Sequence, residues 1–516
     1  ARKRGTKSVV RRGVVRLVTP GTITEERLLD AGQNSFLAAL AHSRSGASGF
    51  ALAWIDLSTG AFFVRPLETM QVAAALARIE PRELILSDAM LDDPEITALL
   101  DGSATTLSPV PKVFFDGATA ESRLCRFFDL QTLDGHGSFE RVELSAAAAI
   151  LSYVEKTQIG ARPPLLVPER ESASSGMSID AATRANLELM QTLSGKRAGS
   201  VFDAIDRTVT GAGARLLAMR LASPSTRVAT IQARQDALAW ALKNPANLSD
   251  LRKQLKRLPD MARALSRLML QRGGPRDLAA IRDGLSEAHA LSGELEGAEG
   301  LIETIHQALN SAGAGDLAAL AGQLTSALAE ELPLQKRDGG FVRTGFTAEL
   351  DEHRGLRDQS RKIIAGLQSQ YAAETSVKAL KIRHNNVLGY FIEVTAQNAG
   401  ALQQDADQRF IHRQTMANAM RFTTTELSAL QSRIAGAADA ALQLELELFE
   451  DFLTQVSAAA AQIQVLSQHL AELDVICALA TLADTQNYCR PEVDESLTFA
   501  IDGGRHPVVE QALRQE

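Results

Sequence analysis

The sequence has little cysteine, few aromatic residues and no long apolar run. Its three cysteines, Cys125, Cys477 and Cys489, do not have the spacing of a zinc or redox motif, and three thiols cannot all pair within one chain. This usage indicates a reducing compartment. No run of about 18 apolar residues occurs, and the basic start, residues 1–4, lacks the apolar segment of a signal peptide. We therefore predict no membrane span.

The motifs of common catalytic sites are also missing from the sequence. No phosphate loop of the form G-x-x-x-x-G-K-[ST] is present, because Gly195 and Lys196 lack both the preceding glycine and the following Ser or Thr. There is no G-x-S-x-G and no H-E-x-x-H, and the nine histidines form no spaced cluster. We expect no catalytic residue, no metal site and no cofactor site among the residues present.

Asp56 is the one residue that suggests an alternative, a catalytic metal site. It ends a predicted strand and precedes the Ser58–Gly60 turn, as does the first metal ligand of ribonuclease-H-like nucleases. Such two-metal sites need several converging acids. The available partners, Glu83, Asp88 and Asp134, are not part of a second motif. We interpret Asp56 as a turn-capping residue, with nuclease chemistry as the alternative.

What is present fits a chain of several globular domains. Hydrophobic residues make up 45% of the 516 residues and charged residues 22%. The length corresponds to about three or four domains. The formal net charge is -8, so a nucleic-acid surface has to be local.

An α/β segment, then a helical segment, are predicted from the periodicity. Apolar runs predict strands at 36–41, 50–56, 61–65 and 83–86, and helices at 69–79, 120–129 and 143–157. Short strands are also predicted at 9–10 and 14–18. Residues 160–178 are rich in Pro and Gly and read as a linker closed by one strand, and residues 180–331 are almost wholly helical.

A small β module then interrupts a long helical pattern. Residues 346–375 predict one long helix, residues 379–395 two strands around a turn at Asn385 and Asn386, and residues 410–424 a further extended stretch. Helix returns from Leu427 to Asn487, with an interruption at Gly436, and a strand is predicted at 497–501. This order places the β module at the tip of a helical arm.

The β module carries a local positive charge. Residues 376–433 contain seven Lys and Arg and four acids, a net charge of +3 against -8 overall. Lys and Arg neutralise phosphates, whereas Asn, Gln and Thr donate to phosphate oxygens without reading sequence. Few aromatics accompany them, which argues against single-strand stacking. A polar exposed hairpin without a ligand is the alternative.

Eight segments, in order, resemble the MutS family of DNA mismatch-repair ATPases. The resemblance covers essentially the whole chain. The segments are 14–22, 49–60, 177–188, 336–340, 389–393, 410–415, 471–474 and 504–510.

The resemblance implies a mainly α fold with an α/β part and five regions. Residues 1–22 are similar to the tail of the mismatch-recognition domain, and 23–160 to a ribonuclease-H-like connector. Residues 161–360 and 434–490 resemble the lever and core helices, 361–433 the clamp, and 491–516 the start of the ATPase domain. The resemblance places the family's Phe-x-Glu wedge before Ala1 and its nucleotide site beyond Glu516, so we expect a piece of a longer protein.

The resemblance also implies a function: this segment grips duplex DNA and relays ATP-driven conformational change in mismatch repair. It implies ATP and Mg²⁺ in the parent protein, a MutL-type partner at the connector, a homodimer through the ATPase domain, and a cytoplasmic, nucleoid-associated location. A recombination or meiotic paralogue, and a protein-interaction scaffold without DNA contact, are the alternatives. The predicted DNA-backbone contacts are Lys381, Arg383, Asn385, Asn386, Arg413, Thr415 and Asn418.

Overall fold

The chain divides into two compact units in the computed structural model. The first unit combines Ala1–Leu324 with Leu453–Glu516, and the second is Thr325–Phe452. The boundaries fall within α14 (Gly315–Ala327) and α18 (Thr425–Ala458). The structure describes residues 14, 16–43, 49–100, 105–159, 161–172, 176–243, 245–385, 388–405 and 407–514.

A six-stranded mixed sheet begins the first unit, in the order β5-β4-β1-β2-β3-β6. β1, β2 and β3 pair antiparallel, whereas β4, β5 and β6 pair in parallel with their neighbours. β1 and β2 are buried over nearly their whole length, which explains why their sequences are continuous apolar runs. The strands are β1 (Phe36–His42), β2 (Phe50–Asp56), β3 (Ala61–Leu67), β4 (Glu83–Ser87), β5 (Thr106–Val110) and β6 (Glu169–Arg170).

Helices cover both faces of this sheet. α4 (Ala120–Phe128) and α5 (Arg141–Gln158) pack on one face, and four consecutive alanines of α5, 146–149, let that helix approach β1 and β2 closely. α1 (Val72–Ile79) and α3 (Pro94–Leu100) pack on the other, with the four-residue α2 (Asp88–Leu91) beside them. The predicted α/β part is confirmed, and its strand order β3-β2-β1-β4-β5 fits the ribonuclease-H-like fold that the resemblance implies.

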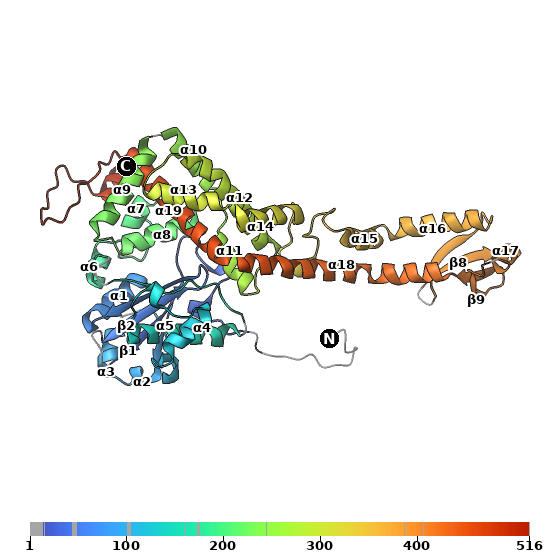
Figure 1. Ribbon diagram of the computed structural model, residues 1–516, viewed down its shortest axis with the longest axis horizontal. Helices are drawn as coiled ribbons and strands as arrows, with labels where there is room; N and C mark the ends of the chain where they lie inside the picture. The colour runs from blue at the N-terminus through green and yellow to red at the C-terminus, as the bar shows by residue number, and fades with distance from the viewer. Residues whose placement is uncertain are drawn as a thin grey trace. The chain divides into compact units, whose positions relative to one another are not determined.

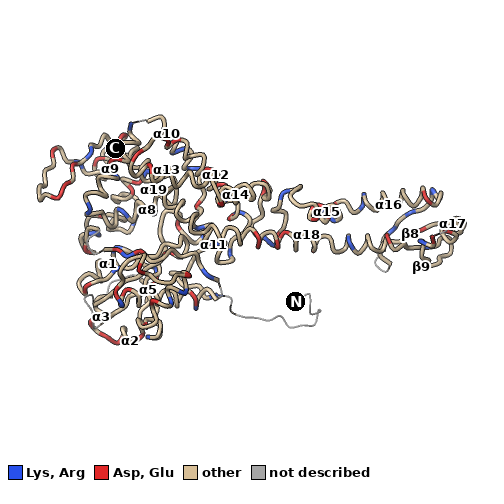
Figure 2. Tube along the Cα trace, viewed as in Figure 1, with Lys and Arg blue, Asp and Glu red and all other residues tan. Residues whose placement is uncertain are grey.

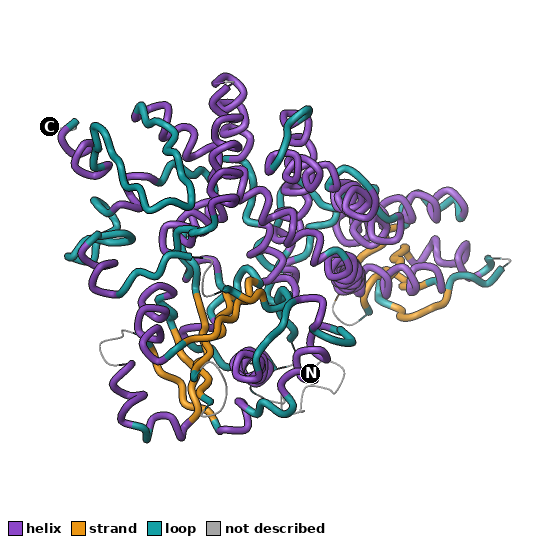
Figure 3. Tube along the Cα trace, turned by 60° about the vertical axis from the view of Figure 1, so that its left-hand side comes forward, coloured by secondary structure: helices purple, strands orange, loops and turns teal. Residues whose placement is uncertain are grey.

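A helical part completes the first unit (Figure 3). α19 (Ala460–Gln486) lies at its centre against α8, α9, α11 and α13. By length and composition α19 is long and apolar enough to cross a membrane. Most of its apolar stretch is buried within the unit, however, as in a core helix. The other helices are α6 (Ala181–Asn186), α7 (Val201–Ile205), α8 (Gly211–Ala222), α9 (Val228–Lys243), α10 (Pro245–Leu255), α11 (Met261–Met269), α12 (Pro275–Ser292), α13 (Leu301–Ser311) and α20 (Pro507–Leu513).

The second unit is a pair of helices, a long return helix and a small sheet (Figure 1). α15 (Ala348–Asp358) and α16 (Ser360–Glu374) run beside α18, and the sheet lies at the far end of α16. The sheet is wholly antiparallel, in the order β7-β8-β10-β9. Its elements are β7 (Lys381–Asn385), β8 (Gly389–Thr395), α17 (Ala399–Gln403), β9 (Ile411–Thr415) and β10 (Ala419–Thr423).

Two helix predictions were wrong in detail. The single helix predicted over 346–375 is two helices that break at Gln359, and the apolar periodicity hides this one-residue break because it continues across it. Gly436 does not interrupt α18; the break lies at Ala459 instead. A glycine inside a helix costs about 1 kcal/mol relative to alanine, which the packing of a long helix easily offsets.

Two strand predictions were also wrong, and five short elements, α2, α17 and α20 among them, were missed. Residues 497–501 form no strand, and the side chains of Leu497 and Phe499 are exposed. Among the described residues of 14–18 there is likewise no strand, while 9–10 lie outside the described residues. β5 and α3 were missed; four of the five residues of β5 are exposed or half-buried, so it has no apolar pattern to detect.

Candidate nucleic-acid interface

The small sheet of the second unit has one covered face and one open face. Ile382, Ile392 and Phe422 are neighbours across β7, β8 and β10, and they pack with side chains of α16 and α18 into one core. Because side chains alternate along a strand, the residues between them point to the opposite face. That open face carries Lys381, Arg383 and their cross-strand partners.

A shared carboxylate organises the charges on the open face. Glu393 of β8 lies between Lys381 of β7 and Arg421 of β10 in the strand register. Its Oε1 is 3.2 Å from Arg383 Nε, and its Oε2 is 3.2 Å from Arg421 Nε. Arg421 also stacks on Phe391, at 4.5 Å, so its side chain is only 19% exposed, whereas that of Arg383 is 56% exposed. Arg421 is therefore fixed in place, and Arg383 presents its guanidinium to solvent.

The β7–β8 turn is held against α18. Asn385 Oδ1 accepts a hydrogen bond from Leu388 N at 2.7 Å, and Gln431 Oε1 accepts one from Tyr390 N at 2.9 Å. Gly389 has a φ of +70°, and a Cβ at this position would overlap the Gln431 side chain. Glycine adopts this φ without strain and leaves Gln431 where it is, whereas any other residue would be strained and would displace the Gln431 side chain. Asn386 lies outside the described residues.

The β9–β10 turn lies at the opposite end of the sheet. Met416 N donates to Ala419 O at 2.8 Å and closes this turn, beside Thr415 and Asn418. Ala419 pairs with Thr395, whereas the other turn begins where Asn385 pairs with Gly389. At about 3.3 Å per residue, six residues of β8 separate the two ends by roughly 20 Å.

Arg413 belongs to a different edge. It is on β9, where the register shift beside Arg421 pairs Gln414 and His412 with β10 and leaves Arg413 without a cross-strand partner. Arg413 is exposed and lines a polar cavity of about 200 Å³ with Thr423 and, from α18, Ser428, Gln431 and Ser432. In the described part of the chain no carboxylate lies within 4 Å of it.

The predicted site residues are therefore spread around the sheet and do not form one cluster. Lys381 and Arg383 share a face with Asn385 at its end, Arg413 lies on the far edge, and Thr415 and Asn418 lie at the other end. Sequence reasoning left Arg421 and Gln414 out of the site, although the alternation along β10 places Arg421 on the same face as Arg383.

Besides Arg383 and Arg421, which share Glu393, two more of the seven basic residues of this region have carboxylate partners of their own. Arg409 is 2.8 Å from Glu374 and 3.0 Å from Asp405, and the hydrogen bonds that it donates to Asp405 and Glu374 raise the pKa of Arg409. Arg433 pairs with Glu352 of α15. Figure 2 shows red and blue segments interleaved around β8, β9 and α17. The net charge of +3 is thus carried mainly by the other basic side chains.

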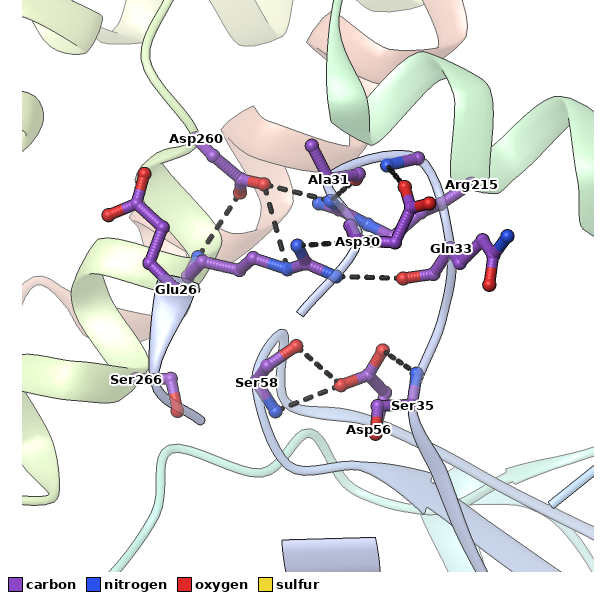
Figure 4. A network of polar contacts seen from close by, with 12 residues as sticks. Glu26, Asp30, Ala31, Gln33, Ser35, Asp56, Ser58, Arg215, Asp260 and Ser266 are labelled. Atoms are coloured by element: carbon purple, nitrogen blue, oxygen red, sulfur yellow. Dashed lines mark hydrogen bonds and ion pairs between the residues drawn. The ribbon is translucent and has the colours of Figure 1, made fainter. Parts of the chain in front are cut away.

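The structure also places Asp56, the residue on which the nuclease alternative depends (Figure 4). Its buried carboxylate accepts hydrogen bonds from Ser35 N (3.1 Å), Ser58 N (2.9 Å) and Ser58 Oγ (2.6 Å). Glu83 is likewise buried and accepts from four donors: Thr19 Oγ1, Gly21 N, Ser108 Oγ and Tyr153 OH. These bonds support the capping interpretation, because both carboxylates are engaged by the chain itself.

Two arginines join the loop before the sheet to the helices, and Figure 4 shows one of them, Arg215, above Asp56. Arg263 of α11 donates to Asp30 O (2.9 Å) and Gln33 O (2.8 Å), and Arg215 of α8 donates to Ala31 O (2.6 Å). Asp260 Oδ2 is 2.8 Å from Arg215. Burial raises the pKa of Asp260, but the positive charges of Arg215 and Arg263 outweigh it, and the net pKa is lowered. We call Arg215, Asp260 and Arg263 the junction.

An α/β domain followed by a helical domain with a small β insertion is thus the architecture of the described chain. Two family models match it in this order: MutS domain II over residues 35–166 and MutS domain III over residues 182–480. The chain belongs to the MutS family. The DNA mismatch repair protein MutS of Rhizobium meliloti (strain 1021) is 57% identical over 523 residues, which cover 100% of this chain and 56% of the relative. The chain thus spans little more than half the length of this curated relative.

Proposed function

We propose that this part of a MutS-type mismatch repair protein grips the DNA duplex through the small sheet of its second unit. The observation that carries the proposal is the pair Lys381 and Arg383, on the sheet face that α16 and α18 leave open. Arg413 extends the positive surface to the β9 edge. Such side chains neutralise phosphates at many positions along a duplex and do not depend on its sequence.

The same surface disfavours recognition of single strands. Phe391 is 3% exposed beneath Arg421, and Phe422 is in the core, so neither ring is open for base stacking. Asn385, Thr415 and Asn418 supply polar groups at the two ends of the sheet, which suits hydrogen bonds to phosphate oxygens. We include these residues, and Asn386, in the proposed interface.

The roles of the other regions are proposals from the family. We assign 1–22 to the end of a mismatch-recognition domain, 23–160 to a connector that binds a MutL-type partner, and 491–516 to the start of an ATPase domain. The lever, 161–360 with 434–490, would pass ATP-driven changes to the clamp, 361–433. ATP, Mg²⁺ and dimerisation belong in this proposal to the whole protein.

A matched pair of double variants tests the DNA interface. Arg383→Gln with Arg413→Gln removes one charge that only shares Glu393 with Arg421 and one charge without an ion pair among the described residues, whereas Arg409→Gln with Arg433→Gln removes two charges that each have a carboxylate partner of their own. Both variants change the net charge equally. Binding to a labelled duplex of about 30 base pairs is measured across a salt series, where each phosphate contact contributes about 0.9 to the slope of log K against log salt.

We expect the first double variant to flatten the slope by about 1.8 and the second to leave it nearly unchanged. Binding should not depend on sequence. Equal losses in both variants would show that net charge alone attracts DNA, and unchanged binding in the first would remove the sheet from the interface.

A further inference from the structure

A cavity of about 340 Å³ lies in the first unit between the sheet and the helices. It is bounded by the start of β1, the end of α1, α6 with the loop after it, and α8. Four arginines line it, and only one carboxylate, that of Glu80, does so among the described residues. The four are Arg78, Arg82, Arg184 and Arg197.

Arg184 is the least satisfied of these arginines. The residue is 7% exposed, and its Nη2 donates to Ala222 O at 2.8 Å. Its Nε and Nη1 have no hydrogen-bond partner, and no carboxylate of the described residues lies within 4 Å of it. Burial, together with the charge of Arg78, lowers the pKa of Arg184, and the negative charge of Glu80 offsets this only in part. Leaving a buried cation unpaired is strongly unfavourable, so this side chain points to an anionic ligand.

The neighbouring arginines are held in place by other groups. Arg78 forms a bidentate pair with Glu171, at 2.7 and 3.2 Å. Arg197 pairs with Asp206 and lies 4.4 Å from the ring of Phe202. Arg82 is exposed at the rim. The cavity therefore holds positioned guanidinium groups in excess of its carboxylate.

A second cavity of about 370 Å³ adjoins the first. It shares Arg78, Phe36 and Met219 with it, and adds Arg220, Arg227 and Arg234 against Glu169 and Glu171. The shared wall thus offers an apolar surface next to the arginines. A ligand with an anionic end and an apolar or aromatic end fits this distribution.

We propose that the Arg184 cavity binds a small molecule that carries two or more phosphate groups. Phosphate oxygens accept several charge-assisted hydrogen bonds at once, and two phosphates would reach the two guanidinium groups, Arg184 and Arg82, that Glu171 and Asp206 do not pair. The phosphates contact Arg184 from the helical side and Arg82 from the sheet side, so the ligand bridges the two parts of the first unit. This proposal is independent of the DNA interface.

Titration calorimetry of the whole chain with inorganic pyrophosphate, and separately with ADP, tests the proposal. Arg184→Gln removes the buried cation that has no ion pair in the described part of the chain, and Arg82→Gln removes an exposed cation at the rim. Arg257→Gln is the control, because Arg257 is an exposed surface residue paired with Glu287. Losing one charge-assisted contact should weaken binding about ten-fold.

Saturable binding that both cavity variants weaken, with the control unchanged, supports the proposal. Tighter binding of ADP than of pyrophosphate identifies a nucleotide as the source of the phosphates; equal affinity identifies the phosphates alone. If Arg184→Gln does not fold, the binding measured for Arg82→Gln still tests the proposal. Absence of saturable binding for both ligands, or equal binding by Arg82→Gln and the control, overturns the proposal.

Discussion

Arg215 and Arg263 of the first unit are 4% and 3% exposed, whereas the Arg383 side chain of the second unit is 56% exposed. The N–H groups of the two buried arginines donate to backbone carbonyl oxygens and pair with Asp260. Arg383 shares one carboxylate with Arg421 and keeps the rest of its donors for solvent or a ligand. In the first unit arginine thus stabilises the interior, whereas in the second unit Arg383 has N–H groups that remain available to bind a ligand.

The largest effect expected is on the junction. Asp260→Ala leaves Arg215 and Arg263 buried without their counter-ion, and should lower the free energy of unfolding by about 3–5 kcal/mol. Asp250→Ala, at an exposed pair with Lys253, should change it by less than about 0.5 kcal/mol. Both tryptophans, Trp54 and Trp240, belong to the first unit, so urea denaturation followed by their fluorescence reports on it. Equal effects of the two substitutions would mean that the junction does not hold the unit together.

Low pH should abolish the contribution of Asp260 to the free energy of unfolding. The pKa of Asp260 is lowered on folding, so its stabilisation is present above the unfolded pKa of about 3.9 and is lost as the pH falls through the folded value. The difference in stability between the wild type and Asp260→Asn should therefore be constant near neutral pH and shrink below about pH 4. Denaturation series at several pH values measure it. A constant difference down to strongly acidic pH would contradict the charge-based account.

In the second unit, backbone geometry matters more than buried charge. Gly389→Ala forces a φ of +70° on a residue with a Cβ and displaces Gln431, and should destabilise the sheet by about 1–2 kcal/mol. Gly355→Ala is the control, because nothing lies near its Cβ and alanine favours helix. Hydrogen exchange of residues 381–423 should rise in the first variant only. Tryptophan fluorescence of the first unit should not change in either.

The elements with continuous patterns are those that the sequence predicts best. β1, β2 and the β2–β3 hairpin follow from apolar runs around Gly60, and the inserted β module follows from the change of period after Tyr371. β5 could not be found, since most of its residues are exposed or half-buried. Its place is decided by parallel pairing with β4, a long-range contact that leaves no local signal.

The site was harder to predict from the sequence than the fold, because it too depends on long-range contacts. Its residues were identified by type, but only the strand register shows that the two turns lie at opposite ends of the sheet. Counting charges also missed that Arg409 is neutralised by Glu374, which is 35 residues away. The Arg184 cavity depends on residues from four separate segments, and a single sequence does not indicate that they meet.

The smallest effect on stability is expected at Glu393. It distinguishes the exposed arginines of the second unit most clearly from the buried ones of the first. Glu393→Gln removes the carboxylate that Arg383 and Arg421 share, yet keeps an oxygen that can still accept from one of them. Because both the face and Arg383 are open to solvent, stability should fall by no more than about 1 kcal/mol. DNA affinity should rise a few-fold, since Arg383 gains freedom to pair with phosphate and the local charge becomes more positive. The measurement is duplex binding at two salt concentrations beside the wild type. The control is Glu426→Gln, because Glu426 is an exposed acid of α18 that accepts a hydrogen bond from Tyr371 and pairs with no arginine of the open face. Weaker binding by Glu393→Gln would show that the carboxylate is needed to aim Arg383, and that this arginine, like those of the junction, acts through a fixed position.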